Sequence, residues 1–388
     1  MDSRKFRTRT ELIERNNGSL PDSYVIGLDV GYSGVKIMAP NKVACFPYYA
    51  RRASEDEFNI VGDTPDDIIL YKDTTTGEFW NVGALAQDLL EDNDTLDSES
   101  SLYGRDRFSS DMFKVCSEVG LGIALMKNDF GDADGKEIEV QTGLPERYKN
   151  DKEDIVDALS GRHAFKIKIG NGDWVDFNFN IDRSRVNVMS QPLGTLFSIC
   201  IDKNGKSKPE AMKILKSKVL IFDPGFGTLD IFTIIKNVVG RGETYSDLGM
   251  KRVFQELSKD LKNQKDSIDI PVPQMQKYLE KGTVRYTNRK ERVSKDYDIE
   301  PLLTKACMRV CSEAVSRMEN AFNLGDYDYL VVTGGTGAAW FNKIESLLNG
   351  YKSTLKIVKG NENDDLSMIY SNVRGFYLYR YNILGSKK

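Results

Sequence analysis

The stretch VIGLDVGYSGVK, residues 25–36, carries an apolar run into a turn that contains Asp29, Gly31 and Gly34 and ends at Lys36. Glycines let backbone N–H groups approach an oxyanion, a lysine adds a positive charge, and a carboxylate can hold a cation through water. The stretch therefore suits a metal-bound phosphate. Taken alone, so short a motif more often marks a β-hairpin with a glycine turn.

A second stretch, VLIFDPGFGTLDIF at residues 219–232, repeats this arrangement. When Asp29 is aligned with Asp223, the first glycine, the aromatic residue and the following apolar positions also coincide. The matched pairs are Gly31 with Gly225, Tyr32 with Phe226, Val35 with Leu229 and Ile37 with Ile231. One repeat half a chain apart predicts a duplicated domain. The match fails where Lys36 falls on Asp230, so the two turns would bring different charges to one ligand.

Composition bounds the class of protein. The chain has 388 residues, of which 40% are hydrophobic and 29% are charged. This is enough for two or three domains in an ordinary soluble globular protein. The net charge is −4, from 54 basic and 58 acidic residues, so no global field draws the chain toward DNA or an anionic membrane. No apolar stretch approaches the ~20 residues of a membrane span. We expect neither direct nucleic-acid binding nor a membrane partner.

Cysteine and histidine usage narrows the chemistry. The five cysteines form no C-x-x-C pair and follow no secretory signal, which indicates a reducing, cytoplasmic location. Cys307 and Cys311 are expected to be packing residues of a helix. His163 is the only histidine, so histidine-centred metal clusters and Ser-His-Asp or Cys-His catalysis lack their parts.

Several segments outside the repeats have a predicted form. Residues 1–22 are polar and basic, and we expect a flexible tail, with contact to a partner or to nucleic acid as the alternative. Residues 91–110, rich in Asp, Ser and Glu, are expected to form a solvated loop. A glycine loop at residues 334–337 stands between a predicted buried strand and a helix, a place where nucleotides and anions bind.

The order of these motifs carries a family likeness. GLDVGYSGVK, VMSQP, LIFDPGFGTLDI, SDLG and VVTGGTGAAW follow the order of the phosphate and adenosine elements of the actin superfamily, which includes actins, heat-shock chaperone ATPases and sugar kinases. Through QTGLPERY and the short chain, the sequence resembles the bacterial actin-like plasmid-segregation proteins of the ParM and Alp group.

That resemblance implies an α/β, actin-like two-lobed fold, in which duplicated mixed-sheet domains enclose a nucleotide cleft. The expected first lobe comprises residues 23–191, completed by a C-terminal helix at 366–388. The expected second lobe comprises residues 192–365.

The resemblance also implies site residues for ATP, or GTP, with Mg²⁺. Asp29 and Asp223 would serve the metal, Asp223 would also position the attacking water, and Gln191 would orient that water. The other implied nucleotide-binding residues are Gly31, Tyr32, Ser33, Gly34 and Lys36 in the first turn, Gly225, Phe226, Gly227 and Thr228 in the second, and Asp247, Gly249, Gly334, Gly335 and Thr336 beside the adenosine. Some plasmid-segregation relatives carry glutamate in place of Gln191. Glutamine can position water without acting as a strong base, so slow hydrolysis is expected.

The implied function is an ATPase whose hydrolysis is coupled to polymerisation. Head-to-tail self-association that does not close on itself yields a helical filament. Such a filament would drive plasmid partition through an adaptor protein bound to centromere-like DNA. The alternative is a small-molecule, sugar-type kinase with the same fold, which would need a base carboxylate and an acceptor pocket, and the sequence offers no motif for either.

Overall fold

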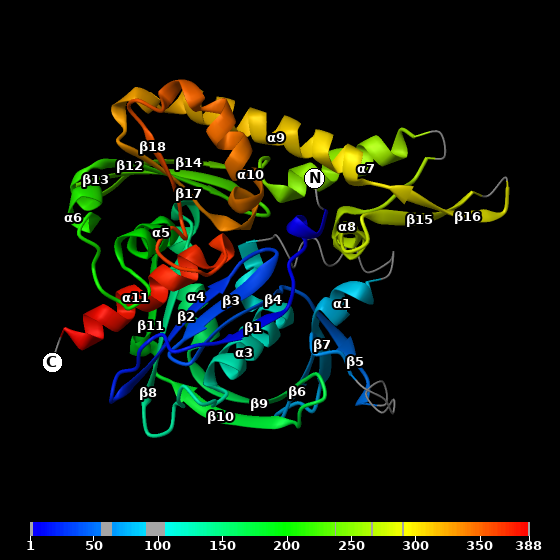
Figure 1. Ribbon diagram of the computed structural model, residues 1–388. Coiled ribbons are helices and arrows are strands. Elements are labelled where there is room, and N and C mark those ends of the chain that lie inside the picture. Colours follow the sequence, from blue (N-terminus) through cyan, green and yellow to red (C-terminus); the bar gives the residue numbers. More distant parts are fainter. Residues whose placement is uncertain are drawn as a thin grey trace. The chain divides into compact units, whose positions relative to one another are not determined.

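The chain forms two units, each built around a mixed sheet, in a computed structural model that describes residues 3–55, 64–90, 105–236, 238–264, 267–288 and 291–386 (Figure 1). Unit 1 comprises residues 1–7, 90–96 and 213–360. Unit 2 comprises residues 8–89, 97–212 and 361–388. The described 3-10 helices are η1 (Ser3–Phe6), η4 (Arg105–Ser109), η5 (Glu146–Asp151), η6 (Arg183–Arg185), η7 (Leu324–Asp326), η8 (Asn349–Tyr351) and η9 (Met368–Tyr370).

The main sheet of unit 2 has the strand order β1-β4-β3-β2-β8-β11. Its strands are β1 (Glu11–Glu14), β2 (Ser23–Val30), β3 (Gly34–Ala39), β4 (Lys42–Pro47), β8 (Glu137–Leu144) and β11 (Val186–Ser190). Strand β2 is buried along almost its whole length, because helices cover both faces of the sheet. Helix α3 (Asp111–Leu125) packs on the face of Leu28, and helix α11 (Ser371–Gly385) packs on the face of its neighbour Gly27.

A second sheet of unit 2, β10-β9-β6-β7-β5, lies on the other side of α3. Its strands are β5 (Ala50–Ala53), β6 (Ile68–Asp73), β7 (Phe79–Gly83), β9 (Gly161–Ile169) and β10 (Val175–Ile181). The remaining helices of this unit are α1 (Ala84–Asp88), α4 (Lys152–Leu159) and α5 (Gln191–Cys200). Gly122 of α3 approaches Phe165 and Ile167 of β9, so one helix joins both sheets into a common core.

The sheet of unit 1 has the order β14-β13-β12-β17-β18. Its strands are β12 (Lys218–Pro224), β13 (Leu229–Ile235), β14 (Val238–Tyr245), β17 (Tyr329–Val332) and β18 (Lys356–Lys359). The helices are α7 (Met250–Lys262), α8 (Val272–Leu279), α9 (Glu300–Ala321) and α10 (Gly334–Leu347), and α6 (Ala211–Lys216) spans the boundary with unit 2. The hairpin of β15 (Thr283–Asn288) and β16 (Val293–Asp298) extends away from this sheet (Figure 1).

The two sheets share one topology. In unit 2 the strands β4, β3 and β2 are antiparallel neighbours, and β2, β8 and β11 are parallel neighbours. In unit 1 the same directions hold for β14, β13 and β12 and for β12, β17 and β18. The predicted fold class, a duplicated mixed-sheet α/β fold of the actin type, is confirmed.

The expected domain limits need three corrections. The C-terminal part of unit 2 begins at residue 361, before the predicted residue 366. The predicted flexible tail at 1–22 contains a strand, because β1 pairs antiparallel with β4 and the Tyr370 hydroxyl donates to the Glu11 carboxylate at 2.8 Å. A strand this short and charged is typical of a sheet edge and gives little periodic signal. The predicted boundary at 191/192 lies instead at 212/213, because α5 follows β11 directly and packs against α11.

The sole histidine is a core residue of unit 2. His163 is 4% exposed, and its Nδ1 lies 3.0 Å from Oε1 of Glu118 while its Nε2 lies 3.3 Å from the carbonyl oxygen of Leu159. The Tyr71 hydroxyl donates to the other oxygen of Glu118. The imidazole thus fastens β9 to α3 and to the end of α4. All five cysteines are also buried, as free thiols.

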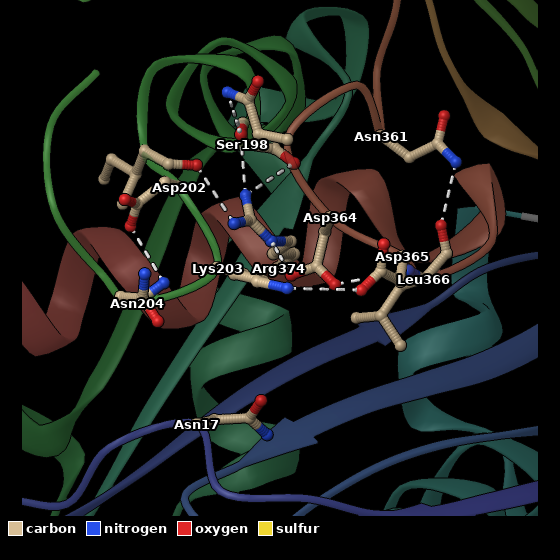
Figure 2. A network of polar contacts seen from close by, with 12 residues as sticks. Asn17, Ser198, Asp202, Lys203, Asn204, Asn361, Asp364, Asp365, Leu366 and Arg374 are labelled. Atoms are coloured by element: carbon tan, nitrogen blue, oxygen red, sulfur yellow. Dashed lines mark hydrogen bonds and ion pairs between the residues drawn. The ribbon is translucent and has the colours of Figure 1, made fainter. Parts of the chain in front are cut away.

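A buried arginine fastens α11 to the end of α5 (Figure 2). Arg374 is 2% exposed, and its Nε donates to Asp364 at 2.7 Å. Its two terminal nitrogens donate to the carbonyl oxygens of Ser198 at 2.6 Å and Ile201 at 3.0 Å. Arg15 donates to the same carboxylate at 2.8 Å. Two guanidinium groups therefore share Asp364, and the segment after β1 is tied to the C-terminal part of the chain.

This network predicts a pH dependence of stability. Burial acts to raise the pKa of Asp364, but the hydrogen bonds and charges of Arg15 and Arg374 outweigh it and lower the pKa. A carboxyl group with a lowered pKa in the folded state stabilises the fold above its unfolded pKa of about 3.9, and this contribution disappears as the pH falls through the folded value. Urea denaturation of wild type should therefore show a steeper loss of stability from pH 5 to about pH 3 than denaturation of Asp364→Asn. Parallel pH curves for the two proteins would contradict this assignment.

Candidate functional site

The first glycine turn joins β2 to β3 in unit 2. The N–H of Gly31 donates to the carbonyl oxygen of Gly34 at 3.0 Å, which closes the turn. Asp29 and Lys36 are cross-strand partners, and Lys36 Nζ lies 3.6 Å from Asp29 Oδ2. Asp29 is 7% exposed. The turn thus presents a carboxylate and an ammonium beside bare backbone, as the sequence predicts.

Gly34 lies in close contact with its neighbours, because a Cβ there would lie 2.7 Å from Cγ2 of Thr8 and 3.1 Å from the carbonyl oxygen of Phe46. A Cβ at Gly31 would lie 2.9 Å from Lys36 Nζ, the movable end of a long side chain. Tyr32 and Ser33 lie half-buried between them. The Ser33 carbonyl oxygen accepts from the N–H of Tyr48 at 3.2 Å. The turn therefore keeps a tight backbone with no room for a side chain at Gly34.

Gln191 lies at the same edge of this sheet. The strands β2, β8 and β11 are parallel, so their carboxyl ends meet at one edge, and Gln191 follows β11 as the first residue of α5. With strands about 4.8 Å apart, β2 and β11 are separated by about 10 Å. The side-chain amide of Gln191 makes no hydrogen bond to any residue that the structure describes, and it is half-buried. Asp29, Lys36 and Gln191 therefore lie at the same edge of this sheet.

The second turn, in unit 1, has the same closure. The N–H of Gly225 donates to the carbonyl oxygen of Thr228 at 2.8 Å, the bond that corresponds to Gly31 and Gly34 in the repeat. Asp223 is 6% exposed and stands opposite Asp230, which is 7% exposed. The repeat that was visible in sequence is therefore also a repeat of backbone geometry.

Asp230 replaces the lysine of the first turn and holds two hydroxyl groups. Thr228 Oγ1 donates to it at 2.8 Å and Thr244 Oγ1 donates at 2.6 Å. The sequence comparison singled out this position as a mismatch but gave it no role. Its structural role is to orient Thr228, a residue predicted to line the phosphates.

The second turn is fastened to α7 and α10. The N–H groups of Met250 and Lys251 donate to the carbonyl oxygens of Gly225 and Phe226 at 3.2 and 2.8 Å. Thr336 Oγ1 donates to the Gly225 carbonyl oxygen at 2.9 Å. The predicted adenosine residue Thr336 therefore belongs to the same cluster as the turn.

Two further predicted glycines complete that cluster. Gly249 has φ +154° and Gly334 has φ +77°. A Cβ at Gly249 would lie 2.7 Å from the Phe226 carbonyl oxygen, and a Cβ at Gly334 would lie 2.7 Å from Oδ1 of Asp223. A side chain at either position would therefore displace the turn or its carboxylate.

The remaining predicted residues of unit 1 lie at the margins of this cluster. Gly227 is half-buried in the turn and Gly335 is exposed in the first turn of α10. Asp247 forms a two-pronged ion pair with Arg317 of α9, at 3.1 and 2.7 Å. That pair braces the segment before α7 against α9, a role that the sequence did not indicate.

One residue near the first turn was missed. Arg107 falls in the stretch 91–110 that was expected to be a solvated loop, yet it is 8% exposed in η4 and donates to the carbonyl oxygen of Val30. Residues 91–104 lie outside the described residues. The sequence near Arg107 does contain a helix-start signal. In RFSSD, residues 107–111, the hydroxyl oxygen of Ser110 caps α3 by accepting from the N–H of Phe113 at 3.1 Å.

The carboxylates suit a hydrated cation better than a closed metal site. Within the described ranges no group of three or more His, Cys, Asp and Glu residues could hold a metal ion. Mg²⁺ usually keeps several waters and binds through one or two carboxylates together with phosphate oxygens. A lone carboxylate at the first turn, Asp29, beside bare backbone fits that donor set when a phosphorylated ligand supplies the rest.

Comparisons with known proteins show which proteins the chain is similar to. Residues 27–194, which include Asp29 and Gln191, match the family model for the N-terminal domain of actin-like proteins. The chain is similar to a non-polymerisable quadruple mutant of pCBH ParM, with 21% identity, a TM-score of 0.70, and coverage of 93% of this chain and 100% of the other. No curated protein sequence matches.

Two further solved structures share the fold. A 15-stranded ParM filament from Clostridium botulinum has 19% identity and a TM-score of 0.67, with coverage of 93% of this chain and 99% of the other. Ta0583, an archaeal actin homologue solved in complex with ADP, has 13% identity and a TM-score of 0.61, with coverage of 92% and 99%. The fold is that of the actin-like proteins, and the resemblance to them that the sequence predicts is confirmed. Across the described residues, no helix combines the length and apolarity needed to cross a bilayer.

Proposed function

We propose that the protein is a nucleotide-dependent actin-like ATPase that assembles into filaments and drives plasmid DNA segregation. The nucleotide is ATP or GTP with Mg²⁺, and both glycine turns contribute to its binding. The observation that carries this proposal is the repeated turn itself. The same closing hydrogen bond follows an aspartate at the same strand position in two sheets that share a five-stranded topology.

The residues of the first turn suit phosphate binding. Bare backbone at Gly31 and Gly34 can approach phosphate oxygens, and Lys36 adds a positive charge. Asp29 and Asp223 would hold Mg²⁺, which would supply positive charge against the phosphate groups. Gln191 can orient an attacking water through its amide, which is free of other hydrogen bonds among the described residues.

The residues of the second turn suit the same ligand from unit 1. Asp223 can accept a hydrogen bond from the attacking water and so fix its direction. Thr228 is held by Asp230 with its side chain already oriented, and pre-oriented polar groups cost no reorganisation during reaction. Phosphoryl transfer needs little else from a protein than positioning and charge stabilisation.

Filament formation is supported by the relatives. The similar ParM structure from Clostridium botulinum is a filament, and the similar pCBH ParM variant is described as non-polymerisable. Self-association through a head-to-tail contact produces an open helical assembly. The net charge of −4 gives no reason for direct DNA binding, so we assign the link to plasmid DNA to an adaptor protein that binds centromere-like DNA.

Sedimentation tests this proposal. Purified protein with Mg²⁺ should pellet in the presence of ATP or GTP and remain in the supernatant with the matching diphosphate. The variant Lys36→Met, which removes the ammonium of the first turn, should pellet less at the same triphosphate concentration. Protein that stays soluble with both triphosphates, or that pellets equally without nucleotide, would refute nucleotide-dependent assembly.

A further inference from the structure

The first glycine turn rests on a buried arginine that no residue motif pointed to. Arg107 is 8% exposed, and its guanidinium Nη2 donates to the carbonyl oxygen of Val30, at the start of the turn. A peptide group is planar, so fixing this carbonyl also fixes the direction of the N–H of Gly31. That N–H donates to the Gly34 carbonyl oxygen at 3.0 Å. The Val30–Gly31 peptide is thus held at both its carbonyl oxygen and its N–H.

The charge of Arg107 is surrounded by aromatic rings. Its Cζ lies 4.7 Å from the ring centre of Tyr32, which is itself in the turn, and 5.4 Å from that of Tyr48. Phe108 and Phe113 are at 5.4 and 5.6 Å. Aromatic faces attract a cation but do not cancel its charge. Burial raises the pKa of Tyr48, and the charge of Arg107 acts on that hydroxyl in the opposite direction.

No carboxylate pairs with Arg107 within the part of the chain that the structure describes, and its buried Nε has no hydrogen-bond partner there. Arg374, the other deeply buried arginine of unit 2 discussed above, is paired with Asp364 at 2.7 Å. A buried charge without a counter-charge is costly. An anion bound at the first glycine turn would supply that counter-charge, and this gives a physical reason for Arg107 to lie beside it.

We propose that Arg107 is a positioning residue for the turn of residues 30–34: it fixes the Val30–Gly31 peptide and sets a buried positive charge behind the turn, which raises affinity for the terminal phosphate groups of a nucleotide. This inference rests on the proposed function. In the second turn, Phe226 packs on Phe254, and backbone N–H groups of α7 hold the carbonyl oxygens of Gly225 and Phe226.

The test compares affinities for a nucleoside triphosphate and its monophosphate, measured by calorimetry on the full chain with Mg²⁺. The nucleotide is whichever of ATP and GTP wild type binds more tightly. Arg107→Met should weaken triphosphate binding by about tenfold, because a charge near the terminal phosphates is lost, and should change monophosphate binding by less than about twofold. Arg107→Lys keeps the charge but not the planar group that reaches Val30, and it should lie between Arg107→Met and wild type.

Arg52→Met is the matched control. Arg52 also lies over an aromatic ring of unit 2, 5.1 Å from the ring centre of Trp80, but it is at the surface and makes ion pairs with Asp111 and Glu78. It should bind both nucleotides as wild type does. If Arg107→Met does not fold, as judged by circular dichroism, Arg107→Lys carries the test.

Two results would overturn the inference. One is triphosphate affinity within about twofold of wild type in the folded Arg107 variants, and the other is an equal loss of monophosphate affinity, which would indicate a general structural effect. Failure of the proposed function is a separate outcome, since in that case wild type itself binds neither ATP nor GTP.

Discussion

Replacement of Asp223 by asparagine is expected to lower the rate of phosphate release at saturating triphosphate by at least about a hundredfold, because an amide lacks the negative charge with which a carboxylate attracts a cation and strengthens its hydrogen bond to water. The fold should survive. Asp223 and Asp230 are cross-strand neighbours, both buried, and like charges opposite one another are destabilising. The variant should therefore melt at the same temperature as wild type or higher.

Asp269→Asn is the control for this experiment. Asp269 is in the same unit, but its side chain is 66% exposed and pairs with Lys262. It should hydrolyse the triphosphate at the wild-type rate. If Asp223→Asn released phosphate within about threefold of wild type, Asp223 would not be the residue that directs the water.

Gly375→Ala is expected to destabilise unit 2 by at least about 3 kcal/mol, because it would force apart two helices that touch through backbone. A Cβ at Gly375 would overlap the carbonyl oxygen of Gly194. Helix α11 cannot move away freely on its other side, where a Cβ at Gly27 would already lie 2.7 Å from the Val373 carbonyl oxygen. Since α5 begins at Gln191, any shift of α5 would also displace the predicted water-orienting residue.

Urea denaturation measures this effect, with Gly350→Ala as its control. Gly350 is exposed in η8, and a Cβ there would meet nothing within 4 Å. It should change stability by less than about 0.5 kcal/mol. Equal unfolding midpoints for Gly375→Ala and wild type would mean that α5 and α11 do not meet at these glycines.

The duplicated fold could be predicted because its signal is local. Each turn has an aspartate two residues before a glycine whose N–H donates to the carbonyl oxygen three residues on, so the matched spacing of Asp29 to Gly31 and of Asp223 to Gly225 corresponds to one backbone geometry. Strand β1 could not be predicted in this way. Its pairing with β4 depends on residues far apart in sequence, and half of its four residues are glutamate.

Residues of the candidate site that belong to short motifs could be named from the sequence. Residues whose role depends on contacts between distant segments could not. Arg107 lies in a polar, charged stretch, and nothing in that stretch shows that Tyr32 and Tyr48, from a distant segment, will lie against its guanidinium. Asp247 was assigned to the nucleotide because of its motif, but its ion pair with Arg317 depends on where α9 packs. Asp230 was visible as the position where the repeat changes charge, yet its hydrogen bonds to Thr228 and Thr244 require the strand register.

The stoichiometry of nucleotide binding tests the central claim, that both turns serve one nucleotide. Calorimetric titration of the full chain with Mg²⁺ and triphosphate should give one nucleotide per chain, and Asp29→Asn and Asp223→Asn should each weaken that single binding event. Two nucleotides per chain, or unchanged affinity in one of these variants, would contradict the account.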